Sequence, residues 1–383
     1  MRGQVEWGDV VGDLSPRSFL EDNWRKLRNR RDVFEQKLLV ENRAGTKYEF
    51  LNNMAPYTGL VLIAGGAATR AKKEVAGDQR ARRYGEEFGL DVHKSRALTP
   101  VPNLFSHDAF SFLPPIITTL DYTLWGVKDS LTTSQGNNLS VVYGNSADVE
   151  EMQGICERWG LTNVHFIPQH IHKGKLKPAG HADALLWMKD RLQEYPYTWT
   201  VFNSDVTDPL TYLELLALHT YPDLSAIMGT ALLKNPTYPL EVDLKGRPTG
   251  KQGHNKLDGA EFKVTEGPSN IGNFVFRTND LTSALSYYDD MFKRGGMYEE
   301  IGRAELAMDH IITDLACGNN VVEGGRLRQL CAYDPWTITS PAKAPSNILG
   351  YLYNQIQNLT AQGLTISTSG RKQYEKVNMI FRS

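Results

Sequence analysis

The chain has 383 residues, of which 41% are hydrophobic and 22% are charged. This length and composition are typical of a globular protein with one large α/β domain and additions, or with two domains. The formal net charge of −2 gives no reason to expect nucleic acid or an anionic membrane as the main partner.

The cysteines and the hydropathy of the chain indicate in which cellular compartment the protein is expected. Cys156, Cys317 and Cys331 are widely spaced and form no Cys-x-x-Cys pair, which favours reduced thiols and argues against a structural zinc site. The sequence has no apolar run of about 18 residues that could span a membrane. Its first residues lack the apolar core of a signal peptide. We therefore expect a cytoplasmic protein that does not span a membrane.

Residues 1–50 are expected to form a helical extension. Ser15 and Pro16 suit the N-cap and the first position of a helix. Apolar residues then recur at helical spacing as far as Val40. The basic cluster between Arg25 and Arg31 is expected to be a solvated helix face, so no chemistry is assigned to it.

The stretch from Gly59 to Arg70 organises the rest of the chain. Its apolar run from Leu60 to Ile63 predicts a buried central strand. Gly65 and Gly66 allow a sharp turn and let backbone N–H groups approach a ligand without a Cβ in the way. A loop of exposed amides before a helix suits an anion, and Arg70 adds a guanidinium for phosphate oxygens. An ordinary strand-to-helix turn is the alternative.

The polar stretch from Lys72 to Lys94 predicts a helix or a mobile flap beside this loop. It leads into the segment from Arg96 to Val101. A cation placed shortly after a glycine loop can fold back onto the same polyphosphate, and Arg96 and Lys94 are the candidates for this role.

From Leu139 onward, strands alternate with helices. We predict strands over 139–143, 163–168, 198–203 and 224–231, and helices over 146–159 (capped by Ser146), 179–195 and 211–220. This alternation is typical of an α/β protein with a doubly wound, mostly parallel sheet. Ligands of such sheets bind outside the carboxyl ends of the strands. Gly65 and Asp205 both follow strand ends, so we expect them to line one cleft.

The later part of the chain is less regular. We predict a hairpin or flap over 241–259, two strands around a turn over 263–276, a helical region over 280–317, and a last amphipathic helix over 345–361 followed by a polar tail. The expected domains are the N-terminal helical extension (1–50), a main domain (51–341), and a C-terminal helix and tail (342–383).

Short motifs, in this order along the chain, resemble those of the sugar-phosphate nucleotidyltransferases. These enzymes make nucleotide sugars from a nucleoside triphosphate and a sugar 1-phosphate. The matching segments are Leu62–Arg70 (the Gly-rich signature loop), Arg96–Val101 (Lys-x-Leu-x-Pro-Val), Gly180–Leu185 (Gly-Thr-Ala-Asp-Ala-Leu), Val201–Asp205 (a strand ending in a metal-binding aspartate), and Glu266–Pro268 with Asn270–Phe276 (Glu-Lys-Pro and Asn-Ala-Gly-x-Tyr-x-Phe). The resemblance covers about residues 59–340 and implies a Rossmann-like nucleotidyltransferase fold.

The resemblance also implies a role for each matching residue. The nucleotide would be bound by Ala64, Gly65, Gly66, Thr69, Arg70, Gly180 and His181. The sugar would be contacted by Glu266, Asn270 and Gly272. Mg²⁺ is the implied cofactor, with Asp205 and Asp334 as its ligands. The implied catalytic residues are Arg70, Arg96 and Asp205.

Several of these residues have a second interpretation. Asp205 would also suit a helix N-cap, and His181 is either a base contact or a local hydrogen-bonding residue. The turn chemistry of Gly267 to Asn270 would by itself account for Glu266 and Asn270.

The chain departs from the family pattern at one glycine and at two positions where the family has lysine. Ala68 replaces the glycine that precedes Thr-Arg. Arg96 replaces a lysine, so a planar guanidinium with several donors stands in place of a compact ammonium group. Gly267 replaces a lysine that binds the sugar phosphate in the family, and Lys263 or Lys251 would be its substitute.

A further departure concerns the second metal ligand. Thr337 stands where the family has an aspartate. Asp334 would take this role from a shifted position, Asp309 is another candidate, or one ligand is lost. These departures leave open an unusual acceptor or a catalytically weakened relative.

The chemistry agrees with the resemblance. Attack of a sugar phosphate oxygen on an α-phosphorus requires two anions brought together, a bridging metal, and cations that stabilise the leaving pyrophosphate. Asp205 offers the hard oxygen ligand that Mg²⁺ prefers. We therefore predict Mg²⁺-dependent transfer of a nucleoside monophosphate from a nucleoside triphosphate to a sugar 1-phosphate or a similar phosphorylated small molecule.

Two alternatives remain at this level. A glycosyltransferase of related fold would use a nucleotide sugar, but the spacing of Asp205 and Asp208 differs from the Asp-x-Asp pair of such enzymes. A non-catalytic nucleotide- or sugar-phosphate-binding regulator is the other. A dehydrogenase is disfavoured because no Gly-x-Gly-x-x-Gly follows a strand. The base, the acceptor and the oligomeric state, including a homo-oligomer, stay open.

Overall fold

The computed structural model describes residues 36–65, 69–105, 110, 112–128, 135–169, 180–202, 213–220, 225–234, 240–242, 248–252, 266–293, 306, 308, 311, 331–333, 345–361 and 363–382. Within this part of the chain, no helix is both long and apolar enough to cross a membrane. The helix expected from Ser15 onward lies outside these residues except for its end, where residues 36–41 are helical.

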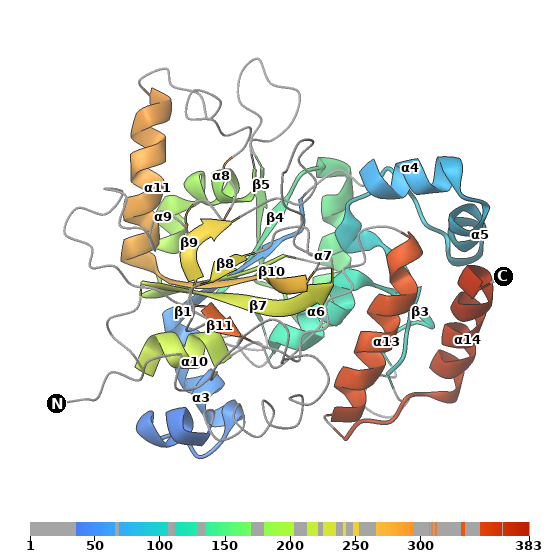
Figure 1. Cartoon of the computed structure of the whole chain (residues 1–383), viewed down its shortest axis with the longest axis horizontal. Helices are drawn as coiled ribbons and strands as arrows, with labels where there is room; N and C mark the ends of the chain where they lie inside the picture. Colours follow the sequence, from blue (N-terminus) through green and yellow to red (C-terminus); the bar gives the residue numbers. More distant parts are fainter. Residues whose placement is uncertain are drawn as a thin grey trace. The chain divides into compact units, whose positions relative to one another are not determined.

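Seven strands form the main sheet, in the spatial order β11, β7, β10, β6, β1, β4, β5 (Figure 1). Along the chain these are β1 (Thr58–Ile63), β4 (Leu139–Tyr143), β5 (His165–Pro168), β6 (Tyr197–Phe202), β7 (Ala226–Lys234), β10 (Glu266–Arg277) and β11 (Cys331–Tyr333). The pairings β1–β4, β4–β5 and β11–β7 are parallel, whereas β10 is antiparallel to β7. This mostly parallel sheet with flanking helices is an α/β architecture, as the alternation of elements predicted.

The chain divides into two compact units. Unit 1 comprises residues 1–59, 170–200 and 211–337, and unit 2 comprises residues 60–169, 201–210 and 338–383. Each unit is therefore assembled from segments that are far apart in the sequence.

The first strands of unit 2 are the apolar runs of the sequence. Every residue of β1 is buried, and Leu139, Val141 and Val142 of β4 have no exposed surface. In the parallel register Leu62 lies opposite Val141. Runs that are apolar at most positions suit strands covered on both faces, and the predicted bounds of these strands are nearly those observed.

The helix predicted over 146–159 is confirmed with a corrected start. A 3₁₀ turn, η4 (Ser146–Asp148), precedes α7 (Val149–Arg158). The cap is Asn145, whose side chain accepts a hydrogen bond from the Ala147 N–H at 3.2 Å, and not Ser146 as predicted. Asn and Ser are about equally good caps, so the sequence alone did not distinguish them.

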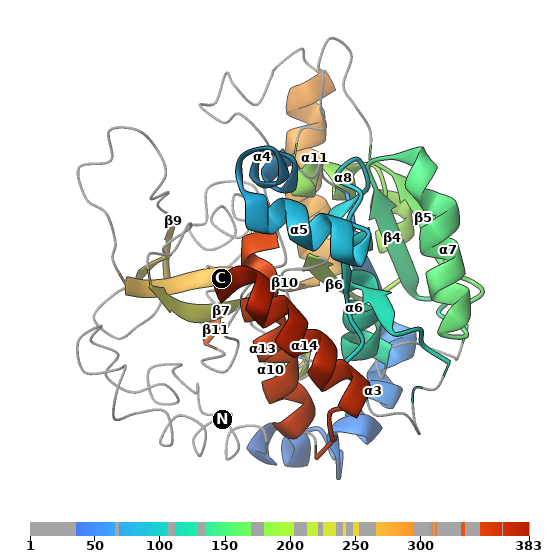
Figure 2. The same ribbon diagram turned by 90° about the vertical axis from the view of Figure 1, so that its right-hand side faces the viewer.

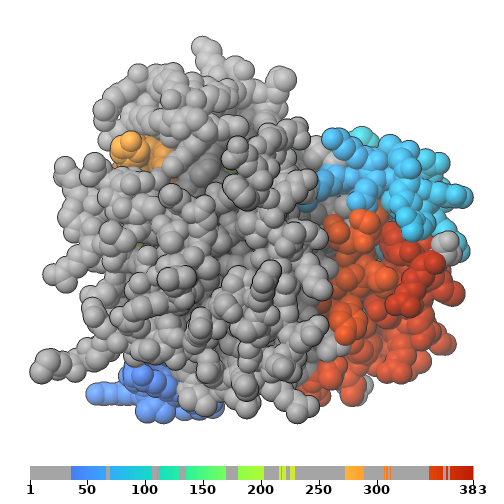
Figure 3. All heavy atoms as spheres, viewed as in Figure 1, coloured from blue at the N-terminus to red at the C-terminus, as the bar shows by residue number. Residues whose placement is uncertain are grey.

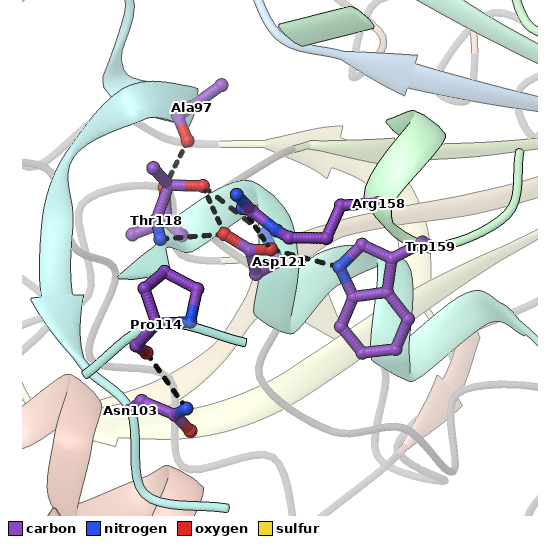
Figure 4. A network of polar contacts seen from close by, with 8 residues as sticks. Ala97, Asn103, Pro114, Thr118, Asp121, Arg158 and Trp159 are labelled. Carbon is purple, nitrogen blue, oxygen red and sulfur yellow. Dashed lines mark hydrogen bonds and ion pairs between the residues drawn. The ribbon is translucent and has the colours of Figure 1, made fainter. Parts of the chain in front are cut away.

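A small two-stranded sheet and a buried helix lie between β1 and β4 in the chain, and the sequence did not predict either. β2 (Pro100–Pro102) pairs antiparallel with β3 (Ile116–Thr118), and α6 (Thr119–Val127) follows. A capping box begins α6, because the Thr118 side chain and the Asp121 carboxylate bond to each other's backbone N–H. Figure 4 shows that the Asp121 carboxylate also meets Arg158 and Trp159.

The stretch after the glycine loop is helical, one of the two alternatives predicted for it. It forms α4 (Thr69–Gly77) and α5 (Gln79–Phe88), and a 3₁₀ turn, η2 (Arg96–Leu98), follows. Asp78 caps α5 by accepting from the Arg80 N–H at 2.8 Å. Gly89 ends α5 in the left-handed conformation, with φ of 73°, which glycine adopts without strain.

The C-terminal part of unit 2 contains a pair of helices. α13 (Pro345–Ala361) has the bounds that the sequence predicted, but the expected polar tail contains a further helix, α14 (Thr368–Arg382). Both pack against α5 and β2 (Figure 2). On the face drawn in Figure 3, the red surface of this pair adjoins the blue surface of α4 and α5. The pair shares one hydrophobic cluster with Tyr84 and Tyr122.

The described helices of unit 1 are α3 (Lys47–Met54), η1 (Ala55–Tyr57), α8 (His181–Leu186), α9 (Lys189–Leu192), α10 (Leu213–Thr220) and α11 (Thr278–Lys293). Among them, α8 to α11 overlap the predicted helices, whereas α3 and η1 lie beyond the helices predicted up to Val40. The single helix predicted over 179–195 is thus two short ones. The hairpin alternative for 241–259 agrees with the antiparallel strands β8 (Leu240–Val242) and β9 (Pro248–Gln252).

The two strands expected around a turn over 263–276 are wrong. The described part of this stretch, from Glu266 onward, is one long strand, β10, in which Glu266 to Asn270 pair with β7 and the register shifts between Asn270 and Phe274. Gly272, with φ of 77°, lies at this irregularity. Pairing with β7 overrides the turn preference of Gly267 and Pro268, and the turn explanation of Glu266 and Asn270 does not hold.

Candidate functional site

The candidate site begins where β1 ends in unit 2. The Ala64 N–H donates to the carbonyl of Val142 at 2.9 Å and thereby extends the β1–β4 ladder by one residue. Gly65 follows and is buried. Ala64 and Gly65 lie beyond the end of β1 and belong to no strand.

Gly65 is in close contact with the ends of the neighbouring strands. A Cβ on this residue would lie 2.6 Å from Oε1 of Gln169 and 3.4 Å from the backbone nitrogen of Gly144. Gly144 follows β4, and the Gln169 N–H donates to the Tyr143 carbonyl at 2.7 Å at the end of β5. The carboxyl ends of three strands therefore meet at Gly65, where a Cβ would have to displace the end of the Gln169 side chain.

Ser95 connects the Arg96 segment to the end of β1. Its hydroxyl donates to the carbonyl of Ala64 and accepts from the Ala97 N–H at 3.2 Å. Its own N–H donates to Oδ2 of Asp148 at 2.8 Å. Ser95 and Asp148 are 7% and 2% exposed, so these bonds are shielded from water and hold the Arg96 segment firmly.

The two cations predicted beside the loop differ in their contacts. Arg96 is half-buried, and its side chain makes no hydrogen bond or ion pair with the described residues. Lys94 forms an ion pair with Glu151, and this carboxylate raises the pKa of the lysine. Arg96 is therefore the cation that remains available for a ligand.

The helix α4 presents further positive charge. Arg70, Lys72 and Lys73 are exposed in its first half, and no acidic residue lies in its first turn. Cations near a helix N-terminus oppose the helix dipole, so this arrangement gains from an anion. Thr69 begins α4, but its side chain and residues 66–68, including Gly66, lie outside the described part of the chain.

Gly180 and His181 belong to unit 1. Gly180 has φ of 114°, and a Cβ on it would lie 2.3 Å from the carbonyl oxygen of Leu306. The same carbonyl accepts from the Ala182 N–H at 3.0 Å. Close packing against the Leu306 backbone therefore requires this glycine, whatever it binds. His181 is half-buried at the start of α8.

Glu266, Asn270 and Gly272 all lie on β10 in unit 1. Gly272 is buried, while the side chains of the other two lie outside the description. The structure thus places the predicted sugar-contacting residues on one strand, in place of a turn.

The predicted metal ligands, Asp205, Asp334 and Asp309, lie outside the described residues. Among the residues that are described, no group of three or more His, Cys, Asp or Glu side chains could hold a metal ion. The Mg²⁺ site stays a prediction.

Sequence reasoning missed three residues that build this site, namely Ser95, Asp148 and Gln169. A serine directly before the predicted cation was the available signal for Ser95, since such a residue often begins a short helical turn. Gln169 directly follows a predicted strand, which is where ligands of α/β sheets are found. Nothing in the sequence pointed to Asp148.

No family model matches the chain, and no curated protein matches it.

Proposed function

We propose that this chain catalyses Mg²⁺-dependent transfer of a nucleoside monophosphate from a nucleoside triphosphate to a sugar 1-phosphate or a similar phosphorylated small molecule, with release of pyrophosphate. The observation that carries the proposal is the hydrogen bond from the Ser95 hydroxyl to the Ala64 carbonyl. This bond joins the loop after β1 to the segment that carries Arg96, so two motifs of the proposed site are neighbours in unit 2.

The strand order supports a ligand site at the same place. The chain passes from β1 to β4 and β5 on one side of β1, and β6 is its neighbour on the other side. In open α/β sheets, ligands bind at the carboxyl ends of strands where the order reverses in this way. Gly65 follows β1 at such a reversal, and the predicted metal ligand Asp205 comes shortly after β6 in the chain.

The charges suit a polyphosphate. Arg70, Lys72 and Lys73 are exposed on α4, and the Arg96 guanidinium is free of partners among the described residues. In the proposed reaction Arg70 binds the β- and γ-phosphates, and Arg96 stabilises the charge that develops on the leaving pyrophosphate. Bound Mg²⁺ would neutralise and align the phosphates, with Asp205 and Asp334 as its predicted ligands.

Pyrophosphate release tests the proposal. The full chain is incubated with Mg²⁺, one of ATP, CTP, GTP or UTP, and one of a panel of sugar 1-phosphates. Asp205→Ala and Arg96→Ala are compared with Asp190→Ala and Arg371→Ala, which remove the same charges from exposed positions on α9 and α14. Removing a residue that stabilises transition-state charge is expected to lower kcat/KM by about 100-fold or more.

The outcomes separate the alternatives. Release with one pairing, lost in the first two variants and kept in the controls, supports the proposal and names both substrates. Triphosphate binding without release favours a different acceptor or a regulator. Consumption of a nucleotide sugar favours a glycosyltransferase. Absence of triphosphate binding overturns the proposal for this site.

A further inference from the structure

A carboxylate on α4 caps the helix α13. Oε2 of Glu74 accepts from the Ser346 N–H at 3.0 Å, and its Oε1 accepts from the Ser346 hydroxyl at 2.7 Å. Pro345 is the first residue of α13, so the Ser346 N–H is one of the donors at a helix start that have no partner within the helix. Residues 272 positions apart in the sequence are thus joined by two hydrogen bonds.

The helix α4 packs against α5 and α13, but its described side chains bury little surface. Among its described side chains only that of Ala71 is buried, and a helix of 9 residues is marginal without packing. Its C-terminal end is held by Arg82 of α5, whose guanidinium donates to the carbonyls of Val75 and Ala76 at 3.4 and 3.2 Å. The bonds of Glu74 are therefore a substantial part of what holds α4 in place.

The partner helix, by contrast, is firmly anchored. Ile348, Tyr351 and Leu352 of α13 have no exposed surface, and they lie in one hydrophobic cluster with residues of α5, α6 and α14. In this cluster Tyr84 of α5 stacks on Phe88, with ring centroids 4.8 Å apart. α13 is thus a rigid support for α4.

We propose that Glu74 is a positioning residue for the triphosphate site. Its link to Ser346 lets the C-terminal helices α13 and α14 hold α4, and with it Arg70 and the helix start, in the conformation that binds the triphosphate. This inference rests on the proposed function. Glu74 touches neither substrate nor reacting atoms in this arrangement, and it acts only through the position of α4.

The link should affect affinity and not the chemical step. If α4 adopts its binding-competent position in only a fraction of molecules, the apparent dissociation constant rises by the inverse of that fraction. Molecules that have bound the triphosphate have α4 in place, so their turnover is unchanged. A residue that merely stabilised the fold would instead lower the amount of active protein, and with it kcat, at constant KM.

The test compares Glu74→Ala, Ser346→Ala and the double variant with Glu86→Ala, which removes the same side chain from an exposed position on α5. Affinity is measured in the full chain for whichever of Mg·ATP, Mg·CTP, Mg·GTP and Mg·UTP the wild-type protein binds best. Loss of a capping interaction predicts a rise of about three- to tenfold in Kd and KM for the triphosphate, with kcat within about twofold of the wild type.

Two further readouts identify the link itself. The double variant should bind no more weakly than Glu74→Ala alone, because Glu74→Ala already removes both bonds and Ser346→Ala removes only the one from the hydroxyl. Ser346→Thr, which keeps the hydroxyl, should retain wild-type affinity. Amide hydrogen exchange in α4 should be faster in Glu74→Ala, while exchange in α13 stays slow beyond its first turn.

Each result has one consequence. Unchanged Kd in Glu74→Ala, with wild-type binding intact, overturns this inference and leaves the proposed function standing. A fall in kcat at constant KM also overturns it, because it assigns Glu74 a purely structural role. Failure of the wild-type protein to bind any of the four triphosphates overturns the proposed function, and the inference with it.

Discussion

The carboxylate of Asp121, in the first turn of α6, forms an ion pair with the guanidinium of Arg158 (Figure 4). Nη2 of the arginine lies 2.8 Å from Oδ1 of the aspartate. The aspartate side chain is completely buried. Its two oxygens also accept hydrogen bonds from the Trp159 indole at 2.9 Å and from the Thr118 N–H and hydroxyl, each at 2.8 Å. The charge is thus compensated by four donor groups.

We predict that Asp121→Ala destabilises the protein strongly. The substitution leaves the Arg158 charge without its partner and removes the capping box of α6, and breaking a buried pair costs about 3–5 kcal/mol. Urea unfolding measures the change in the free energy of unfolding. Glu150→Ala, on an exposed position of α7, is the control and should change it by less than about 1 kcal/mol. Equal effects of the two substitutions would contradict the prediction.

The glycines Gly180 and Gly65 should respond differently to alanine. At Gly180 the new Cβ would meet the Leu306 carbonyl in a backbone with φ of 114°; because neither can move freely, we expect a loss on the order of 2–4 kcal/mol. At Gly65 the Cβ would meet the end of the Gln169 side chain, which can swing away. We expect a loss of at most about 1 kcal/mol there, with weakened triphosphate binding.

A third glycine provides the control for this pair. Gly154 lies exposed within α7, and a Cβ on it would have nothing within 4 Å. Gly154→Ala should raise the free energy of unfolding by about 0.5–1 kcal/mol, because alanine is the better helix former. Denaturant unfolding of the three variants measures their free energies of unfolding, which should be highest for Gly154→Ala and lowest for Gly180→Ala. A Gly180→Ala variant with the free energy of unfolding of the wild type would contradict the prediction, because the Leu306 backbone would then have moved at little cost.

The elements predicted most accurately are those whose own residues show a clear hydrophobic pattern. β1 and β4 were found from continuous apolar runs, and α13 from its periodicity after Pro345. β2 was missed because Pro100 and Pro102 suppress any strand signal, although prolines are tolerated in so short a pair. α14 was missed because its buried residues are few, namely Gly370, Val377 and Ile380.

The site was predictable only where its residues are close in sequence. The Gly65 loop and Arg96 could be named from motifs, but the Ser95 bond to Ala64 spans 31 positions and depends on how the strands pair. Similarly, Gly267 and Pro268 favour a turn locally, yet pairing with β7 makes them part of a strand. Tertiary contacts decide such positions, and local patterns do not contain them.

The single described free cysteine should be unreactive in the folded protein. Cys156 is buried, and this burial raises the pKa of its thiol to about 12. At pH 8 almost no thiolate is present, and the thiolate is the nucleophile. Alkylation by iodoacetamide, followed by mass spectrometry in a Cys317→Ser, Cys331→Ser background, should modify Cys156 only as fast as the protein unfolds.

Addition of urea is the control for this experiment. Above the unfolding midpoint the modification rate should rise to that of a free cysteine. Rapid modification in native buffer would contradict the prediction, because it would require Cys156 to be exposed without unfolding.

His219 should make stability depend on pH. It lies at an exposed position near the end of α10, where Nδ1 lies 3.0 Å from the Tyr197 hydroxyl and the ring packs on Phe50, with centroids 6.1 Å apart. Burial, and then the charge of Arg277, lower the pKa of His219 below its ordinary value. The unfolded chain therefore binds this proton more tightly than the folded protein does.

The sign follows from linkage. The free energy of unfolding should be constant above the ordinary histidine pKa of about 6.5 and should fall as the pH drops from there toward the lower folded-state pKa. His219→Gln should flatten this fall when urea unfolding is measured between about pH 5 and pH 8. His93→Gln, at an exposed position, should leave the slope unchanged. A slope that is the same in wild type and His219→Gln would mean that other groups set the acid sensitivity of the fold.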